Sequence, residues 1–344
     1  MSNDKLRLGV IGAGLLGARH ARVWNELPDT ELVAVCDLNP ARAAEIANQY
    51  SALAFSDYRK MLDKAELDAV SVATPDHLHR EPVLAALAAR KHVLQEKPLA
   101  TNADDARAIV HASEASNCIV MVNYSQRYVP DHIWIHDAIA RGEIGTPQFV
   151  LSIKHDNISV PMNMIGSWSA ETSPLYFMSS HDLDLVHWFL GQDPVSVFAH
   201  ESRGTLAALG IAVHDGLNAL IQFQNHISAN FHSSWIHPNT YPRLADGYMQ
   251  IIGSVGALTY NNRTRTAELF NAHGGQKIEF AGPHTADIVD GNVTGAFVRS
   301  LRYFLDCIRQ KREPDTSPRR VLATALAQAA ILESLRTGQP MFVQ

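Results

Sequence analysis

Three glycines near the start of the chain have the spacing of a phosphate-binding turn. Gly12, Gly14 and Gly17 form a G-x-G-x-x-G pattern, and the apolar run at residues 6–11 comes directly before it. Gly12 permits a tight turn, Gly14 lets the backbone approach a pyrophosphate, and Gly17 allows a helix to pack closely on the preceding strand. The positive end of that helix then faces the phosphate charge. The pattern therefore predicts a dinucleotide-binding site.

An acidic residue follows the glycine motif at the distance expected of a ribose-binding carboxylate. Asp37 ends the next apolar run, residues 31–36, and stands 20 residues after Gly17. A carboxylate at this point accepts hydrogen bonds from the adenosine ribose. Because it would also repel a 2′-phosphate, we expect NAD as the cofactor. Arg42 leaves NADP possible, since its guanidinium would reach a 2′-phosphate if its helix tilted inward.

A lysine follows a later strand and has the position for chemistry. Residues 93–96 are expected to form a strand, and Glu96-Lys97-Pro98 stands at its end. Ligands of a parallel sheet bind where loops leave the carboxyl ends of its strands. We therefore expect the ammonium group of Lys97 near the nicotinamide end of the cofactor, where it can act on a reacting oxygen.

A second loop of this kind contains two histidines. Thr74 and Pro75 follow the strand expected at residues 69–73, and His77 and His79 come shortly after them. No other ligand cluster with zinc-like spacing accompanies these histidines, so we expect no metal site. A contact with the cofactor or a capping role is the expectation for His79.

The elements that must position these groups alternate through the first third of the chain. This alternation predicts a doubly wound parallel sheet. After Pro130 one amphipathic helix, residues 133–140, precedes alternating runs that predict an open, mainly antiparallel sheet. We expect a dinucleotide-binding domain over residues 1–125 and a substrate-binding and oligomerisation domain over residues 126–344. The expected elements of the first domain are strands at 6–11, 31–36, 69–73, 93–96 and 119–122 and helices at 15–26, 79–89 and 103–115.

Composition excludes several classes of function. The chain has 344 residues, of which 46% are hydrophobic and 19% charged, enough for two domains with their own cores. A net charge of −6 gives no support to nucleic-acid or anionic-membrane binding. No apolar stretch is long enough for a membrane span, and the first apolar run lacks the features of a signal peptide. We therefore expect a cytoplasmic protein with reduced cysteines.

The motifs taken together resemble the Gfo/Idh/MocA oxidoreductases, the family of glucose-fructose oxidoreductase and inositol dehydrogenase. The resemblance extends over essentially the whole chain. It implies a Rossmann domain joined to an α/β domain with an open antiparallel sheet, and a lysine-histidine pair that acts on a hydroxyl of a sugar or cyclitol. It rests on the glycine loop, Thr74-Pro75 with His79, Glu96-Lys97-Pro98, residues 123–130 and 142–147, His181-Asp182-Leu183-Asp184 with Trp188 and Gly191, residues 253–256, and residues 334–340.

The histidine of that pair would be His181, and the local sequence predicts a helix around it. Ser179 and Ser180 precede the histidine as capping residues, and Gly191 ends the apolar stripe that follows. At a helix N-terminus the dipole keeps the imidazole neutral, so His181 is the expected general base. Asp184 shares its helix face and would orient the ring or a substrate hydroxyl.

The chain departs from its relatives at one position of this segment. They usually carry a glycine-rich turn and an aspartate four residues before the histidine, where this chain has Phe177. The inositol-type triad and a close copy of its substrate preference are therefore not expected here. Hydride transfer does not require that aspartate, because Lys97 and His181 still handle the oxygen and its proton.

Further site residues are implied by similarity to inositol dehydrogenases. Arg127 would stand near the nicotinamide and the substrate, and His155 and Asn157 would meet substrate hydroxyls. The full set of expected cofactor contacts is Gly12, Gly14, Leu15, Leu16, Gly17, Asp37, Arg42, Thr74, Pro75, His79, Glu96, Lys97 and Arg127.

The sequence thus predicts an NAD-dependent dehydrogenase of a sugar, sugar derivative or cyclitol. The expected partners are a small polyhydroxylated substrate and further copies of the chain, as a homodimer or homotetramer joined through the open sheet. Three alternatives remain open. They are an NADP-linked reductase working in the opposite direction, a glycosidase that retains NAD, and a non-catalytic NAD-binding regulator.

Overall fold

The protein is described by a computed structural model that covers residues 5–344. The chain forms two compact units. The first contains the N-terminal part up to Ser125 together with residues 286–322, and the second contains residues 126–285 and 323–344. The division after residue 125 agrees with the expected domain boundary. Residues 286–322 differ from the expectation, because they belong to the first unit and interrupt what the sequence analysis treated as one continuous second domain.

The first unit is built on a six-stranded parallel sheet with the order β3-β2-β1-β4-β5-β6. The order starts at β1 and proceeds outward in both directions, which is the doubly wound topology that the alternating segments predict. Its elements are β1 (Leu6–Ile11), α1 (Leu15–Glu26), β2 (Thr30–Cys36), α2 (Pro40–Gln49), β3 (Leu53–Phe55), α3 (Tyr58–Lys64), β4 (Ala69–Val72), α4 (Arg80–Ala88), β5 (His92–Glu96), α5 (Ala103–Ala115), β6 (Val120–Asn123), β15 (Asp287–Val289), β16 (Asn292–Thr294) and α9 (Ala296–Gln310).

Helix α9 explains why the chain returns to this unit. Phe297, Leu301, Phe304 and Leu305 lie on one side of the helix and are all buried. This apolar face packs against β5 and β6. Because those strands are buried on both faces in a doubly wound sheet, they need a covering helix on each side, and α9 supplies one of them.

The second unit contains a nine-stranded sheet with the order β14-β13-β12-β11-β7-β10-β9-β8-β17. Every neighbouring pair is antiparallel except β7 and β10, so the sheet is mixed and mainly antiparallel, as expected. Its elements are α6 (Pro130–Ala140), β7 (Pro147–Asn157), α7 (Ser180–Leu190), β8 (Pro194–Ser202), α8 (Thr205–Ala208), β9 (Gly216–Phe223), β10 (Ser228–His237), β11 (Ala245–Gly253), β12 (Gly256–Asn261), β13 (Thr266–Asn271), β14 (Gly274–Glu279) and β17 (Met341–Phe342), while α10 (Pro318–Thr337) ends in this unit.

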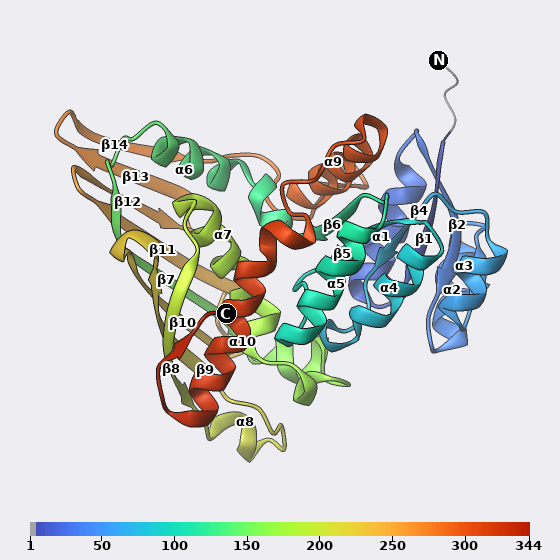
Figure 1. Ribbon diagram of the computed structural model, residues 1–344, viewed down its shortest axis with the longest axis horizontal. Coiled ribbons are helices and arrows are strands. Elements are labelled where there is room, and N and C mark those ends of the chain that lie inside the picture. Colours follow the sequence, from blue (N-terminus) through green and yellow to red (C-terminus); the bar gives the residue numbers. More distant parts are fainter. Residues whose placement is uncertain (1–4) are drawn as a thin grey trace. The chain divides into compact units, whose positions relative to one another are not determined.

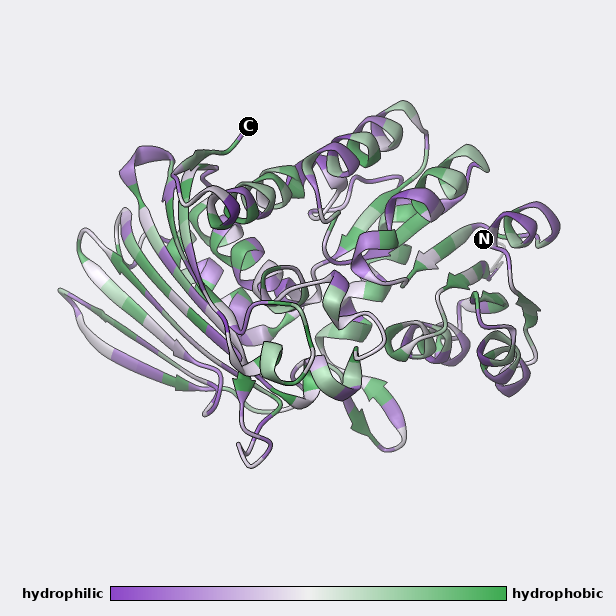
Figure 2. Cartoon of the chain, turned by 90° about the horizontal axis from the view of Figure 1, so that it is seen from below, coloured by the Kyte–Doolittle hydropathy of each residue, from purple (hydrophilic) through white to green (hydrophobic). Residues whose placement is uncertain are grey.

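The two faces of this sheet differ in what covers them. Helices α6 and α7 lie on one face (Figure 1), and the core between them and the strands includes Val150, Leu183 and Ile251. Side chains on the other face alternate with these along each strand, which Figure 2 shows as bands of hydrophobic and hydrophilic residues. Phe149 and Phe270 on that second face are more than half exposed. The second unit thus keeps an open sheet face.

None of the helices that the structure describes is long and apolar enough to cross a membrane.

Candidate active site

The glycine loop has the geometry that its spacing predicts. Gly12 has a φ of +92°, and a Cβ at this position would lie 2.6 Å from the carbonyl oxygen of Ala73. A Cβ on Gly17 would lie 1.7 Å from the carbonyl oxygen of Gly12, so α1 packs against the turn through a contact that only glycine allows. At Gly14 no atom lies within 4 Å of an added Cβ. The open space at Gly14 and the start of α1 beside it fit a pyrophosphate.

The carboxylate of Asp37 is fixed at the end of β2 by the backbone. Its Oδ2 accepts a hydrogen bond of 2.8 Å from the N–H of Ala13, and its Oδ1 accepts one of 2.8 Å from the N–H of Asn39. The guanidinium of Arg42 lies 3.8 Å from Oδ2. The carboxylate therefore lies directly beside the glycine loop, which is the place required of a group that binds the adenosine ribose.

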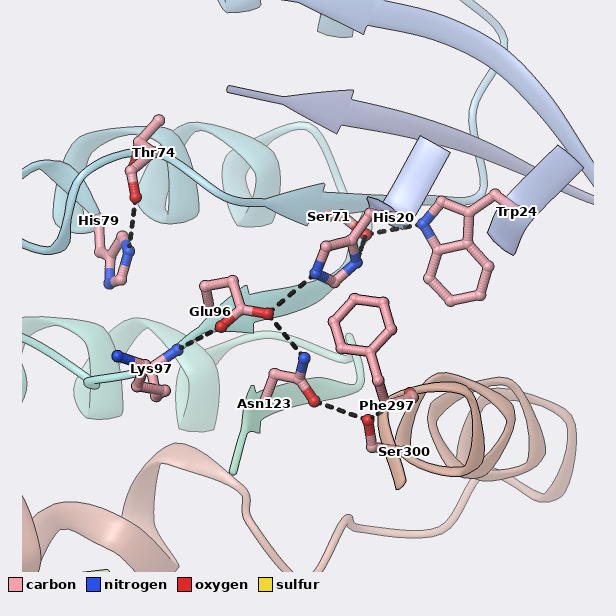
Figure 3. Close-up of polar contacts among 10 residues, drawn as sticks. All are labelled: His20, Trp24, Ser71, Thr74, His79, Glu96, Lys97, Asn123, Phe297 and Ser300. Carbon is pink, nitrogen blue, oxygen red and sulfur yellow. Dashed lines mark hydrogen bonds and ion pairs between the residues drawn. The ribbon is translucent and has the colours of Figure 1, made fainter. Parts of the chain in front are cut away.

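Lys97 follows directly after Glu96, whose side chain is the centre of a buried network (Figure 3). Oε1 of Glu96 lies 2.9 Å from Nε2 of His20 and accepts a hydrogen bond of 2.7 Å from Nδ2 of Asn123. Oδ1 of Asn123 in turn accepts a hydrogen bond of 2.8 Å from Ser300 Oγ on α9. The network thus connects β5 to α1, β6 and α9. It fixes the strand end from which Lys97 emerges.

The ring of His20 lies between Ser71 and Glu96, with Nδ1 3.1 Å from Ser71 Oγ and Nε2 facing the carboxylate. Trp24 donates from Nε1 to the same Ser71 Oγ over 2.8 Å. Nε2 donates to Glu96, because an ionised carboxylate only accepts. The fully buried ring also makes an edge contact with Phe297, with 5.0 Å between ring centroids.

This environment keeps a negative charge beside Lys97. Burial by itself would raise the pKa of Glu96, but the hydrogen bond and the electrostatic attraction of His20, the hydrogen bond from Asn123 and the positive charge of Lys97 together hold that pKa below its ordinary value. Lys97 itself is half-buried at the strand end. An ionised carboxylate therefore directly precedes the half-buried Lys97 in the chain.

The second loop of the first unit is joined to the lysine loop by His79. Its Nδ1 lies 2.8 Å from the carbonyl oxygen of Pro98, and its Nε2 lies 3.2 Å from that of Thr74. Burial lowers the pKa of His79, so the ring is neutral at pH 7 and donates to one of these carbonyls at a time. Gln95 also donates to the Pro98 carbonyl, over 2.9 Å. His79 thus braces the two loops from within the fold.

His181 lies in α7, but the start of this helix differs from the expectation. A π-helical turn at Leu175–Ser179 runs directly into α7, and Ser179 has helical backbone angles and makes no capping hydrogen bond. Its hydroxyl instead contacts the carbonyl of Pro174 and Ser233 Oγ. The expected N-cap, and the dipole argument that it gave for a neutral His181, are therefore wrong. Gly191 does end the helix, in the left-handed conformation.

Arg127 and Asp184 meet in a buried ion pair within the second unit. Nε of Arg127 donates to one carboxylate oxygen over 2.8 Å, and an Nη donates to the other over 2.6 Å. The guanidinium also lies over the ring of Trp188, 5.6 Å from its centroid. Asp184, which stands one helical turn after His181 in α7, thus positions Arg127.

His155 and Asn157 lie apart from this arrangement. The core residue Val150 and Lys154 are on the face of β7 that α7 covers, so His155 is on the opposite, open face, where its Nδ1 lies 2.8 Å from Ser234 Oγ. Burial and the neighbouring rings of His232 and His237 lower the pKa of His155 to about 4. Similarity to inositol dehydrogenases predicts that His155 meets substrate hydroxyls. The structure places His155 on the face of β7 opposite to α7, the helix that contains His181.

The side-chain amide of Asn157 forms hydrogen bonds with backbone groups near the ends of β7 and β10. Nδ2 donates to the carbonyl of Pro238 over 2.8 Å, and Oδ1 accepts from the N–H of Ser159 over 2.9 Å. The side chain is buried. Asn157 therefore stabilises the chain where β7 and β10 end, and its substrate contact stays a prediction.

Phe177 occupies an aromatic and aliphatic cluster. Its ring centroid lies 5.9 Å from that of Trp235 in an edge-to-face contact and 6.2 Å from that of Trp168. The cluster also contains Val160, Ile165 and Met178. An apolar packing role thus accounts for phenylalanine at this position.

The network around Glu96 includes residues that the sequence analysis did not assign to the site. These are His20, Ser71, Asn123 and Ser300, all of them buried. A signal was present for His20, because it is a polar residue in the apolar stripe of α1, three positions after Gly17. Ser300 carried no such signal, since it follows Asn123 by 177 residues.

Within residues 5–344 no group of three or more His, Cys, Asp or Glu side chains has an arrangement that could hold a metal ion.

Several known proteins are similar to this chain. An inositol 2-dehydrogenase of Rubrobacter xylanophilus is 33% identical over 223 residues, which are 64% of this chain and 62% of that protein. The matched stretch thus spans less than two thirds of that relative. An inositol 2-dehydrogenase of Rhizobium meliloti is 28% identical over 329 residues, with 95% of this chain and 96% of that protein covered.

Solved structures show the same fold over the whole chain. A levoglucosan dehydrogenase in complex with NADH and L-sorbose superposes with a TM-score of 0.86 at 23% identity, and covers 99% of each chain. This likeness shows the fold.

The two domains also match models of one protein family. Residues 6–124 match the model described as an oxidoreductase family with an NAD-binding Rossmann fold, and residues 132–259 match the GFO/IDH/MocA C-terminal domain. The first domain is thus an NAD-binding Rossmann domain, and the chain belongs to the GFO/IDH/MocA family of oxidoreductases.

Proposed function

We propose that the protein is an NAD-dependent dehydrogenase that oxidises a hydroxyl of a sugar, sugar derivative or cyclitol. The observation that carries the proposal is the anchoring of Glu96-Lys97 at the end of β5, in a domain whose glycine loop and Asp37 fit NAD. A lysine held in this way at the carboxyl end of a parallel strand suits a reacting group at the hydride end of the cofactor. The names of the inositol dehydrogenase relatives support a polyhydroxylated substrate.

In the proposed mechanism the nicotinamide, when bound, supplies the hydride acceptor. Lys97 binds the oxygen of the reacting hydroxyl, and the carboxylate of Glu96, whose pKa is lowered, stands next to it in the chain. His181 takes the hydroxyl proton as general base. Arg127, positioned by Asp184, binds further hydroxyls of the substrate.

The proposal includes neither His155 nor an aspartate before His181. His155 is on the open face of the sheet, and Phe177 is engaged in aromatic packing. Substrate selection therefore differs from that of an enzyme with an aspartate at that position, because a carboxylate that binds a hydroxyl rejects analogues without it more strongly than an apolar contact does.

The test is a screen of polyols, cyclitols and aldoses with NAD, followed by NADH absorbance. Lys97→Ala and His181→Ala are expected to lower kcat by at least ~10²-fold on the best substrate, the lower end for a lost acid–base group. Lys60→Ala and His111→Ala, which change exposed residues of the same types, serve as matched controls. Full turnover in both site variants would contradict the proposal and favour a non-catalytic role.

Two further readouts distinguish the other activities. Higher turnover with NADP than with NAD would favour the NADP-linked reductase and contradict the assignment of Asp37 to the ribose. Cleavage of a glycoside without net release of NADH would favour the glycosidase that retains NAD.

A further inference from the structure

The second domain contains a cavity of its own, of about 350 Å³. It is lined by residues of α6, α7, β7, β11 and β12 and of the loops at Arg243 and His284. The volume lies in the range of small-molecule sites. None of the residues assigned above to hydride transfer, to the cofactor or to the substrate is among its lining residues.

One wall of the cavity carries a buried ion pair. Nζ of Lys154 on β7 donates to Oδ1 of Asp182 on α7 over 3.2 Å, and each side chain is about one tenth exposed. The charge of Asp182 is thus matched by Lys154. A lysine ammonium has three N–H donors, and Asp182 accepts one of them. Lys154 therefore retains capacity to donate to a molecule in the cavity.

A further cation on the rim has no carboxylate opposite it. Arg243 is exposed and lines the cavity, and no ion pair joins it to another residue of the part of the chain that the structure describes. The neighbouring buried carboxylate, Asp131, is bound by Arg265 over 2.8 Å and accepts a hydrogen bond from Tyr260. With both carboxylates matched by other cations, the cavity has an excess positive charge. This excess favours an anionic ligand.

The lining also offers groups that suit hydroxyls. Nδ1 of His132 lies 2.9 Å from the carbonyl oxygen of Gln126, and since a carbonyl only accepts, Nδ1 carries the proton. Nε2 of the neutral ring is then an acceptor. Burial, first, and the charges of Lys154 and His284 lower the pKa of His132 to about 4, so the ring stays neutral at pH 7. The side chains of Ser152, Tyr248 and Asn262 add further polar groups to the lining.

We propose that this cavity is a binding site for a small hydroxycarboxylate. The carboxylate of the ligand lies between Lys154 and Arg243, and its hydroxyls bond to His132, Asp182 and the polar side chains around them. The lining residues are not those assigned to hydride transfer, and the inference does not depend on the proposed function. An acid of the size of a six-carbon sugar acid suits the volume.

The test measures binding to the full chain by calorimetry, without NAD, at pH 7.5. The probes are D-gluconate and D-sorbitol, which differ in one carboxylate that sorbitol replaces by a hydroxymethyl group. Gluconate is expected to bind at least ~10-fold more tightly than sorbitol, because sorbitol lacks the carboxylate that makes a charge-assisted hydrogen bond. Arg243→Gln is expected to weaken gluconate binding by at least ~10-fold and to leave sorbitol binding unchanged.

The matched control is Arg203→Gln, an exposed arginine of the same domain that does not line the cavity. It is expected to leave gluconate binding unchanged. Because Arg243 is exposed, its replacement is not expected to alter thermal unfolding, which is measured in parallel. Lys97→Ala, in the other domain, is expected to retain gluconate binding.

Three outcomes would overturn the proposal. They are equal affinities for gluconate and sorbitol, an unchanged affinity in Arg243→Gln, and loss of binding in Lys97→Ala, which would assign the acid to the hydride-transfer site. NADH titration of the same preparations reports on the cofactor site separately. Failure of the proposed dehydrogenase function is therefore distinguished from failure of this inference.

Discussion

Arg127 donates two hydrogen bonds to the two carboxylate oxygens of Asp184, at 2.8 and 2.6 Å, and both side chains are buried. A buried charge without a partner is strongly unfavourable, and in this pair each charge neutralises the other. The pair holds the guanidinium of Arg127 in a fixed orientation against α7, where Asp184 stands three residues after the proposed base, His181.

We predict that Asp184→Asn lowers the free energy of unfolding by ~3–5 kcal/mol, because it leaves the guanidinium buried without its counter-charge. Denaturant unfolding measures the change. Asp193→Asn, which removes an exposed carboxylate bound to His187, is the control and should cost less than ~1 kcal/mol. Similar losses in the two variants would mean that water compensates Arg127.

The ion pair also makes a prediction about coupling. Arg127→Leu combined with Asp184→Leu should be less destabilised than the sum of the two single variants, since no unpaired charge remains. A double-mutant cycle at constant pH gives the coupling energy. Additive effects would show that the two groups act independently.

The glycine loop provides a matched pair of substitutions. Gly14→Ala adds a methyl group with no protein atom within 4 Å, so the protein should fold normally but bind NADH at least ~10-fold more weakly, because the methyl occupies the space for the pyrophosphate. Gly17→Ala should instead lower the melting temperature, because its Cβ would lie 1.7 Å from the carbonyl oxygen of Gly12. Thermal unfolding and fluorescence titration with NADH separate the effects. Unchanged NADH affinity in a folded Gly14→Ala protein would contradict the fit.

The lowered pKa of Glu96 predicts a specific pH dependence of stability. A carboxyl group with a pKa lower in the folded than in the unfolded protein stabilises the fold above the unfolded pKa, and this contribution is lost as the pH falls through the folded value. We therefore expect the difference in unfolding free energy between wild type and Glu96→Gln to be largest near pH 7 and to shrink in acid below about pH 4.5, the ordinary value of the group. Urea unfolding across this range measures it. Glu66→Gln, with an exposed side chain, is the control. A difference that is constant with pH would rule out the charged network.

The open sheet face predicts self-association. Phe149, Leu220, Ile252 and Phe270 are exposed apolar side chains of β7, β9, β11 and β13. Light scattering should give a mass of two or four times 37.8 kDa, and Phe270→Lys should shift it toward a single chain. A monomer mass for the wild type would contradict the expected homo-oligomer.

Local sequence determined the first βαβ unit and the cofactor site. The residues concerned lie within the first 37 positions, where Gly12 has a positive φ and Gly17 packs against the carbonyl oxygen of Gly12. Hydrophobic periodicity likewise predicted the parallel and the antiparallel sheet. A strand buried on both faces has a continuous apolar sequence, and a strand buried on one face alternates apolar and polar residues. These features depend on short separations along the chain.

Tertiary structure alone decided how the site residues are held. His20 and Glu96 are 76 residues apart, and Asn123 and Ser300 are 177 residues apart, so no periodicity marks them as hydrogen-bond partners. The same holds for the return of α9 to the first unit. It holds for His155, whose face of β7 is set by the side on which α7 packs. A buried polar group must be satisfied by whichever partner the fold brings to it, and only the folded chain determines which partner that is.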